Sequence, residues 1–149
     1  MDRIIEMEGV MTTPLKKIEH PKGDLFHIMR KDEKSYKGFG EVYISTINFE
    51  DVKAWKKHFK MTCNFVVPLG KIKIVLVDLR ENSKSINKKA EFILSTDDYF
   101  RLTIPPGVWY GFKGLSENLN ILINFANIIH DPLEQINSDY NKSKIKYDW

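Results

Sequence analysis

The 149-residue chain has almost no cysteine, because Cys63 is its only thiol. A single cysteine excludes an intrachain disulfide framework and a zinc site built from several cysteines. Long apolar runs are also absent, since none approaches the roughly 20 residues that cross a bilayer. The first six residues lack the basic and then apolar pattern of a signal peptide. We therefore expect a cytoplasmic protein with no membrane partner.

A strong excess of charge of one sign is missing as well. The chain has 23 Lys and Arg against 20 Asp and Glu, an excess too small to indicate a nucleic-acid partner. One basic and aromatic cluster stands out, formed by Lys53, Trp55, Lys56, Lys57, Phe59 and Lys60. Such a cluster is a solvated face, a phosphate site or an RNA-binding patch. Because no other segment extends the basic surface, we expect no nucleic-acid partner.

Strand signals dominate between residues 41 and 126, where short runs of β-branched and aromatic residues alternate with turn formers. The predicted strands cover residues 42–47, 53–59, 65–67, 71–78, 90–94, 100–104, 108–112 and 119–126. This spacing predicts an all-β fold, a β-sandwich or a jelly-roll barrel, in a single domain that spans residues 1–149. Helical signal is confined to short stretches near Asp51 and at 132–135.

The two ends of the chain are less regular. We expect residues 1–37 to add edge strands, which the subunits of a dimer would exchange or each keep. The tail, 133–149, is polar until Ile145, Tyr147 and Trp149. Because a terminal tryptophan is usually held by packing, we expect the tail to fold back on the body of the domain.

Three segments and the C-terminus carry a resemblance to a known family. They are 52–58 (Val-Lys-Ala-Trp-Lys-Lys-His), 70–80 (Gly-Lys-Ile-Lys-Ile-Val-Leu-Val-Asp-Leu-Arg), 104–112 (Ile-Pro-Pro-Gly-Val-Trp-Tyr-Gly-Phe) and 145–149 (Ile-Lys-Tyr-Asp-Trp). In this order they resemble dTDP-4-dehydrorhamnose 3,5-epimerase and related sugar-nucleotide epimerases of the cupin superfamily, over residues 38–149. The resemblance implies a cupin-type jelly roll, a homodimer, no cofactor, and action on a nucleotide-linked 4-keto sugar without a metal.

The chain departs from that family at positions that carry its chemistry. When the segments are aligned through Val52 and Trp55, Lys56 stands where the family has its catalytic histidine. Tyr110 replaces a second histidine. The family's catalytic-acid tyrosine falls at 127–129, where no hydroxyl is present.

A divergent subset of the family is the better match. It carries Trp-Lys-Lys-His, found here at 55–58, and His-Asp-Pro-x-Glu, found here at 130–134. The aspartate that supports the catalytic histidine in the family would fall near Asp139.

Epimerisation beside a ketone needs a base and a group that stabilises the enolate. Strand alternation places Lys56, His58 and Lys60 on one face of their strand. We expect His58 to accept the proton, because the ordinary pKa of histidine, about 6.5, suits a base, and Lys56 to steady the enolate or a phosphate. Tyr110 would donate a hydrogen bond to the sugar carbonyl. A surface histidine and a core tyrosine are the structural alternatives.

Seven further residues are expected to bind substrate: Lys53, Trp55, Lys60, Arg80, Trp109, Asn124 and His130. The guanidinium of Arg80 suits a diphosphate, and an internal ion pair with Asp78 is the alternative. The two tryptophans stack on a base or sugar, or they pack in the core. Asn124 needs hydrogen-bond partners if it is buried in its apolar strand.

A metal site is not expected, because Lys56 and Tyr110 occupy positions at which many cupins carry metal-binding histidines. The first hypothesis is therefore an epimerase or isomerase that acts on a nucleotide-linked 4-keto-6-deoxy sugar in surface-polysaccharide synthesis. The alternative is a non-catalytic cupin that binds a nucleotide sugar or another anion.

Overall fold

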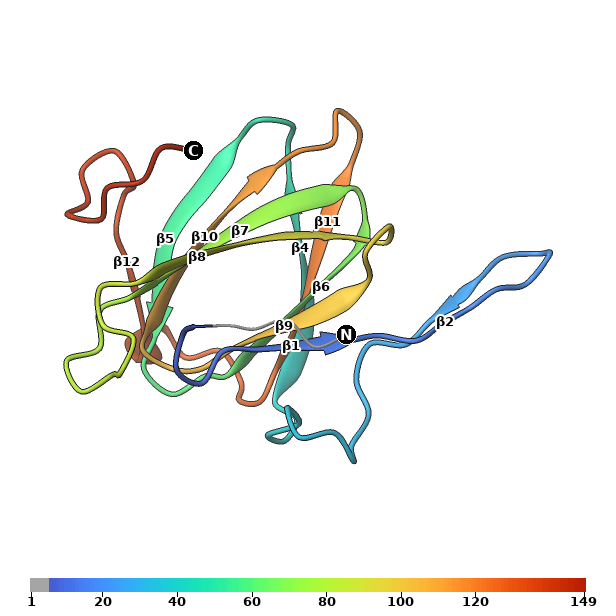
Figure 1. Ribbon diagram of the computed structural model, residues 1–149, viewed down its shortest axis with the longest axis horizontal. Helices are drawn as coiled ribbons and strands as arrows, with labels where there is room; N and C mark the ends of the chain where they lie inside the picture. The colour runs from blue at the N-terminus through green and yellow to red at the C-terminus, as the bar shows by residue number, and fades with distance from the viewer. Residues whose placement is uncertain (1–5) are drawn as a thin grey trace.

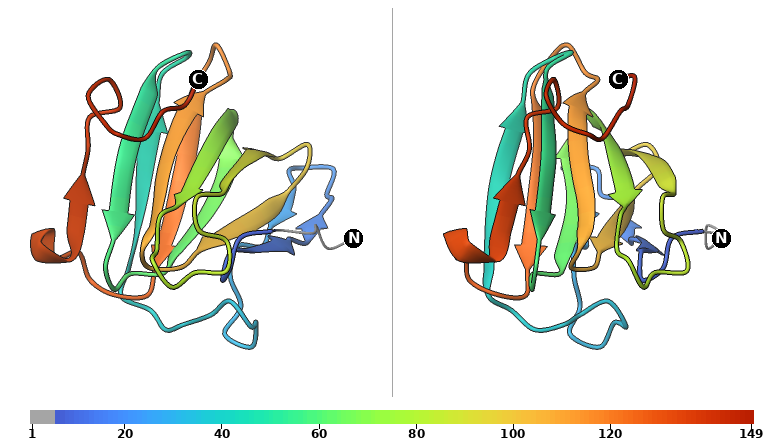
Figure 2. Two further views of the ribbon diagram at one scale, coloured as in Figure 1. Left: turned by 60° about the vertical axis from the view of Figure 1, so that its left-hand side comes forward. Right: turned by 90° about the vertical axis from the view of Figure 1, so that its left-hand side faces the viewer.

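The computed structural model describes residues 6–149 as two five-stranded antiparallel sheets that face each other (Figures 1 and 2). The first sheet contains, in spatial order, β1 (Met11–Pro14), β9 (Phe100–Ile104), β6 (Cys63–Leu69), β11 (Asn120–Ala126) and β4 (Glu41–Ile47). The second contains β12 (Gln135–Asn137), β5 (Val52–His58), β10 (Val108–Gly114), β7 (Lys71–Asp78) and β8 (Lys89–Ser95). A small hairpin of β2 (Lys17–Ile18) and β3 (Leu25–Phe26) projects from the body (Figure 1).

The predicted all-β jelly roll is confirmed, and each predicted strand is present with its ends shifted by a few residues at most. The short helix expected at 132–135 is the 3₁₀ helix η1 (Pro132–Glu134). The helical stretch expected near Asp51 was wrong. The chain turns there instead, with the Asp51 N–H donating to the Asn48 carbonyl, because only four residues connect β4 to β5.

The N-terminal segment contributes an edge strand within its own chain, because β1 pairs with β9. Exchange of residues 1–37 between subunits stays a prediction, and residues 1–5 of that range lie outside the described residues.

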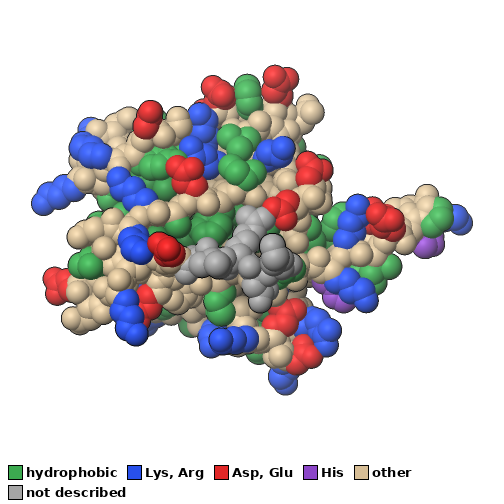
Figure 3. Space-filling model, viewed as in Figure 1, with side chains coloured by type: hydrophobic (Ala, Val, Ile, Leu, Met, Phe, Trp, Pro, Cys, Tyr) green, Lys and Arg blue, Asp and Glu red, His purple; other side chains and the backbone are tan. Residues whose placement is uncertain are grey.

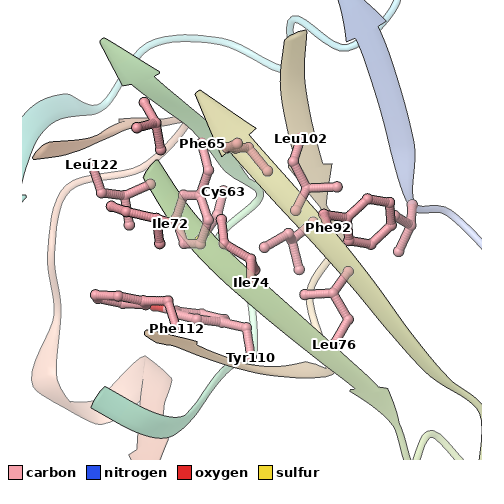
Figure 4. Packing of buried hydrophobic residues seen from close by; sticks show 14 of the residues in the cluster. Cys63, Phe65, Ile72, Ile74, Leu76, Phe92, Leu102, Tyr110, Phe112 and Leu122 are labelled. Atoms are coloured by element: carbon pink, nitrogen blue, oxygen red, sulfur yellow. The ribbon is translucent and has the colours of Figure 1, made fainter. Parts of the chain in front are cut away.

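The main core fills the space between the two sheets. Alternate residues of β7, Ile72, Ile74 and Leu76, are fully buried there, and they meet side chains of the opposite sheet such as Phe65 and Leu122 (Figure 4). Burying each such side chain contributes about 1.5–3 kcal/mol to folding. The core therefore fixes how the two sheets face each other, and with them the position of any site between them.

The second sheet is also covered on its outer face. Val75 and Val77 of β7 point away from the main core and pack with Trp55 and with Ile145 of the C-terminal segment. The ring of Trp149 lies 5.2 Å from that of Trp55. The C-terminal segment thus lies against the back of the sheet that carries β5 and β10.

Surface charges are mixed. Figure 3 shows Lys and Arg side chains interspersed with Asp and Glu over the visible face. Within residues 6–149, no helix is long and apolar enough to cross a membrane.

Candidate active site

A cavity of about 630 Å³ lies between the two sheets, in the size range of small-molecule sites. The first sheet lines it with residues of β4, β6 and β11, and the second with residues of β5 and β10. Asn137, the last residue of β12, and residues 138–141 complete the wall. Polar groups therefore reach one cavity from both sheets.

A β-bulge in β5 decides which side chains face this cavity. Lys56 pairs with Tyr110 and Ala54 pairs with Gly111, and these two partners are adjacent on β10. Trp55 is therefore an extra residue of β5 that has no partner on β10. Gly111 permits the close approach, because a Cβ there would lie 2.5 Å from that of Ala54. After the bulge, Lys56 points into the cavity while the Trp55 ring packs on the outer face.

His58, the last residue of β5, is held by a carboxylate distant in sequence. Its Nδ1 is hydrogen-bonded to Oε1 of Glu134 on η1, and both side chains are 3% exposed. Oε2 of Glu134 accepts from the backbone N–H groups of Lys60 and Met61, each at 3.1 Å. The pairing of β12 with β5, which sets Gln135 opposite His58, brings η1 to this place.

The environment sets the protonation of this pair. Burial lowers the pKa of His58 below its ordinary value, although Glu134 acts in the opposite direction. Burial alone would raise the pKa of Glu134, but the hydrogen bonds from His58, Lys60 and Met61 outweigh it and lower that pKa. The pair is therefore a carboxylate and a neutral imidazole. Since a carboxylate only accepts, Nδ1 carries the proton and Nε2 is a free base.

Tyr110 connects this base to the cavity. Its hydroxyl lies 3.2 Å from Nε2 of His58, and its side chain lines the cavity whereas that of His58 does not. Burial raises the pKa of Tyr110 well above its ordinary value, so the hydroxyl stays protonated and donates to Nε2. The three side chains form one hydrogen-bonded path from a buried acid to the cavity wall.

Three other predicted residues reach the same cavity. Lys56 lies beside Tyr110, and Lys53 lines the cavity while its Nζ donates to the Thr46 carbonyl at 2.7 Å. Asn124 of β11 lines the opposite wall and donates through Nδ2 to the hydroxyl of Tyr43 at 2.8 Å. These lysines bring positive charge to the wall that contains the His58 path.

Arg80 lies elsewhere, in the ion pair that was the alternative for it. Its Nε and one Nη donate to the carboxylate of Asp78, each at 2.8 Å, and that Nη also donates to the Glu8 carbonyl. The hydroxyls of Ser83 and Ser85 donate to the same carboxylate. Burial would raise the pKa of Asp78, but these hydrogen bonds lower it well below its usual range. Arg80 is thus engaged in holding the loop after β7.

The two tryptophans pack on the outer face of the second sheet. Trp55 is a lining residue of the cavity, but its ring meets Trp149. Trp109 does not line the cavity, and the Nζ of Lys57 lies 5.1 Å from its ring centroid. The structure therefore places both rings in packing positions.

Lys60 and His130 also lie outside the cavity lining. Lys60 is exposed and enters the site only through its backbone N–H, which holds Glu134. His130 is exposed after β11, where its backbone N–H donates to the Glu41 carboxylate at 2.8 Å.

Sequence reasoning missed two residues of the site. Glu134, rather than Asp139, supports His58; Asp139 lines the cavity and accepts from the backbone N–H of Asn141. The His-Asp-Pro-x-Glu segment contained the signal for Glu134, since it ends on that acid. Tyr43 gave no signal beyond its place in a predicted strand. Among residues 6–149, no group of three His, Cys, Asp or Glu side chains is arranged to hold a metal ion.

Comparisons with known proteins identify the family that the chain matches. The family model of dTDP-4-dehydrorhamnose 3,5-epimerase matches residues 55–149. The chain is 36% identical to a dTDP sugar isomerase of Desulfovibrio desulfuricans, with a TM-score of 0.87 over 91% of this chain and 88% of that one. It is 29% identical to the spore coat polysaccharide biosynthesis protein SpsL of Bacillus subtilis, over 85% of this chain and 83% of that protein.

A more distant structure shows the fold alone. It is NovW of Streptomyces spheroides, 16% identical, with a TM-score of 0.88 over all of this chain and 78% of that one. The family match covers the site from Trp55 through β10 to η1, where the hydrogen-bonded path of Glu134, His58 and Tyr110 lies. The chain belongs to the dTDP-4-dehydrorhamnose 3,5-epimerase family.

Proposed function

We propose that this protein is a sugar-nucleotide epimerase of polysaccharide biosynthesis, which inverts a carbon beside the ketone of a dTDP-linked 4-keto-6-deoxy sugar. One observation carries the proposal: the buried base His58 is connected through the Tyr110 hydroxyl to the wall of a substrate-sized cavity. Family membership and the similarity to a dTDP sugar isomerase and a polysaccharide biosynthesis protein support the substrate class and the setting.

The first chemical step is removal of the proton beside the ketone. The Tyr110 oxygen takes this proton from carbon while its own proton passes to Nε2 of His58. His58 becomes an imidazolium, and the carboxylate of Glu134 stabilises that charge across the Nδ1 hydrogen bond. The electron pair of the broken C–H bond moves into an enolate, whose negative charge rests on the sugar oxygen.

The enolate needs a cation, and the lysines of β5 supply one. Lys56 lies on the cavity wall next to Tyr110, where its ammonium group stabilises the negative oxygen. In this scheme Lys53, which lines the cavity at the exposed start of the same strand, binds the diphosphate of the nucleotide. Asn124 contacts the sugar from the opposite sheet. No cofactor takes part in this scheme.

The alternative, a non-catalytic nucleotide-sugar binder, is less favoured because a buried base and its supporting acid contribute nothing to binding alone. The two functions differ in one measurable product. We expect the wild-type protein to convert dTDP-4-keto-6-deoxyglucose into an epimer that chromatography separates from the substrate. Saturation-transfer contacts to this sugar without any epimer would show a binder.

The proposal includes a homodimer in the cytoplasm. Edge strand β4 supports the dimer, since its outward side chains Val42 and Ile44 are 52% and 63% exposed. Light scattering coupled to size exclusion should give twice the chain mass of 17.5 kDa. A mass of one chain at micromolar concentration would contradict the dimer.

A further inference from the structure

Inversion at carbon places a stereochemical demand on the cavity. The proton leaves from one face of the sugar and must return to the other face, so a second proton-carrying group has to stand across the substrate from the base. The His58 path reaches the cavity from β5 and β10 of the second sheet. The first sheet faces β5 and β10 across the cavity, so it is the wall from which we expect the partner group.

Tyr43 is placed to meet this demand. It lies on β4 of the first sheet, and its side chain lines the cavity that Tyr110 lines from the second sheet. The remaining first-sheet lining residues with polar side chains are Ser45 and Asn124. A phenol is the stronger acid of these groups.

The hydrogen bonds around Tyr43 fix the direction of its proton. The backbone N–H of Asn64 only donates, and it is bonded to Oδ1 of Asn124 at 3.1 Å, so the amide orientation of Asn124 is settled. The Asn124 Nδ2 must then face Tyr43 and donate to its oxygen at 2.8 Å. In the part of the chain that the structure describes, residues 6–149, no group accepts the proton of Tyr43 itself. That proton is available to a ligand.

The side chains that support Tyr43 are buried and hydrogen-bonded. Asn64 and Asn124 are each 2% exposed, and Asn64 Oδ1 accepts from the hydroxyl of Thr103 at 2.6 Å. A network in which each member has a partner holds the phenol in one place without reorganisation during the reaction.

We infer that Tyr43 is the catalytic acid that returns a proton to the sugar carbon from the face opposite the His58 path. The inference rests on the proposed function and names the group that completes it. The Tyr43 O–H bond breaks as the new C–H bond forms, and the electron pair for that bond comes from the enolate. Tyr43 is left as a phenolate that takes a proton from water, while the His58 imidazolium releases one to water, so the cycle closes.

Burial raises the pKa of Tyr43 to about 12, so the acid form is populated at neutral pH. The same raised pKa makes the group a weak acid toward ordinary bases. It still protonates an enolate carbon, because the C–H bond of a ketone is far less acidic than a phenol.

The test separates proton removal from proton return. In deuterium oxide, proton NMR follows the replacement of the hydrogens beside the ketone of dTDP-4-keto-6-deoxyglucose by deuterium, which we call wash-out. Chromatography follows the epimer. We expect Tyr43→Phe to keep wash-out within about fivefold of wild type while epimer formation falls at least 100-fold. Tyr99→Phe is the matched control, since it removes a hydroxyl that only donates to the His27 carbonyl away from the cavity.

A second variant tests the same point without removing the phenol. Asn124→Asp replaces the amide donor by an acceptor that captures the Tyr43 proton. Because Asn124 also lines the cavity, the readout is the ratio of epimer formation to wash-out, which we expect to fall at least 20-fold below the wild-type ratio. Epimer formation by Tyr43→Phe at the wild-type rate would overturn the inference. An equal loss of wash-out and inversion would overturn it too. If the wild-type protein itself gives neither, the proposed function fails and this inference falls with it.

Discussion

Replacement of Glu134 by glutamine perturbs the base through a single atom. The variant keeps an oxygen that accepts from the backbone N–H groups of Lys60 and Met61, so its amide nitrogen faces His58. That nitrogen is a donor, and it forces Nδ1 of His58 to accept and Nε2 to carry the proton. The free base opposite Tyr110 is lost, although the shape of the site is kept.

The magnitude follows from the hydrogen bonds that change. Loss of the required histidine tautomer costs about 10⁴-fold in an equivalent acid-to-amide substitution of a serine-protease triad, so we expect a ~10³–10⁴-fold slower wash-out. Three bonds to a buried carboxylate become bonds to a neutral amide, each weaker by about 1 kcal/mol. The free energy of unfolding should therefore fall by ~2–3 kcal/mol, which lowers Tm by roughly 5–10 °C.

The assay is wash-out at 25 °C, with a thermal melt to show that the variant is folded. Asp131→Asn is the matched control, because it makes the same change on an exposed acid that caps η1. It should keep the wild-type rate. A folded Glu134→Gln protein with more than a tenth of wild-type activity would refute the assignment of Glu134 to the base.

Four further predictions concern the rest of the site and its surroundings. Arg80→Gln should lower Tm through loss of the Asp78 ion pair and leave KM within twofold, whereas a tenfold higher KM at unchanged Tm would make Arg80 a substrate ligand after all. Lys56→Met should lower kcat at least 100-fold with little change in KM, and an equal kcat would remove the lysine from enolate stabilisation. Because the pKa of His58 lies below its ordinary value of 6.5, kcat should decline toward acid pH with a midpoint below pH 6.5. A midpoint above pH 6.5 would contradict the neutral buried base. Stability should be full above pH 6.5 and fall as pH drops, since unfolded His58 and Glu134 bind protons that the folded pair resists, and denaturant melts at pH 7 and 5 check this sign.

The strands were predictable because their signal is local. Alternation along β7 and β11 and the turns between strands are written in consecutive residues, and the structure follows them. The resemblance added the jelly-roll arrangement. Alternation also placed Lys56 and His58 on the same side of β5, as the structure has them.

Features that depend on distant contacts were not predictable in the same way. The bulge at Trp55 depends on Gly111 of the neighbouring strand, so an alignment through Val52 and Trp55 gave Lys56 the position of the base. Glu134 lies 76 residues from His58, and only the pairing of β12 with β5 brings them together.

Side-chain partners decided the remaining cases. A guanidinium near an acid serves as an internal ion pair or as a phosphate ligand, and sequence alone leaves both open for Arg80. The hydroxyls of Ser83 and Ser85 also donate hydrogen bonds to the Asp78 carboxylate, and they favour the ion pair.

The central claim is that His58 is the base, which accepts the proton of Tyr110 as the Tyr110 oxygen takes the proton from the sugar. Wash-out of the hydrogens beside the ketone of dTDP-4-keto-6-deoxyglucose, measured side by side for the wild type and His58→Asn, tests it most directly. We expect complete wash-out by the wild type and none above background by the variant, while saturation-transfer contacts with the sugar persist in both. Wash-out by folded His58→Asn at the wild-type rate would contradict it.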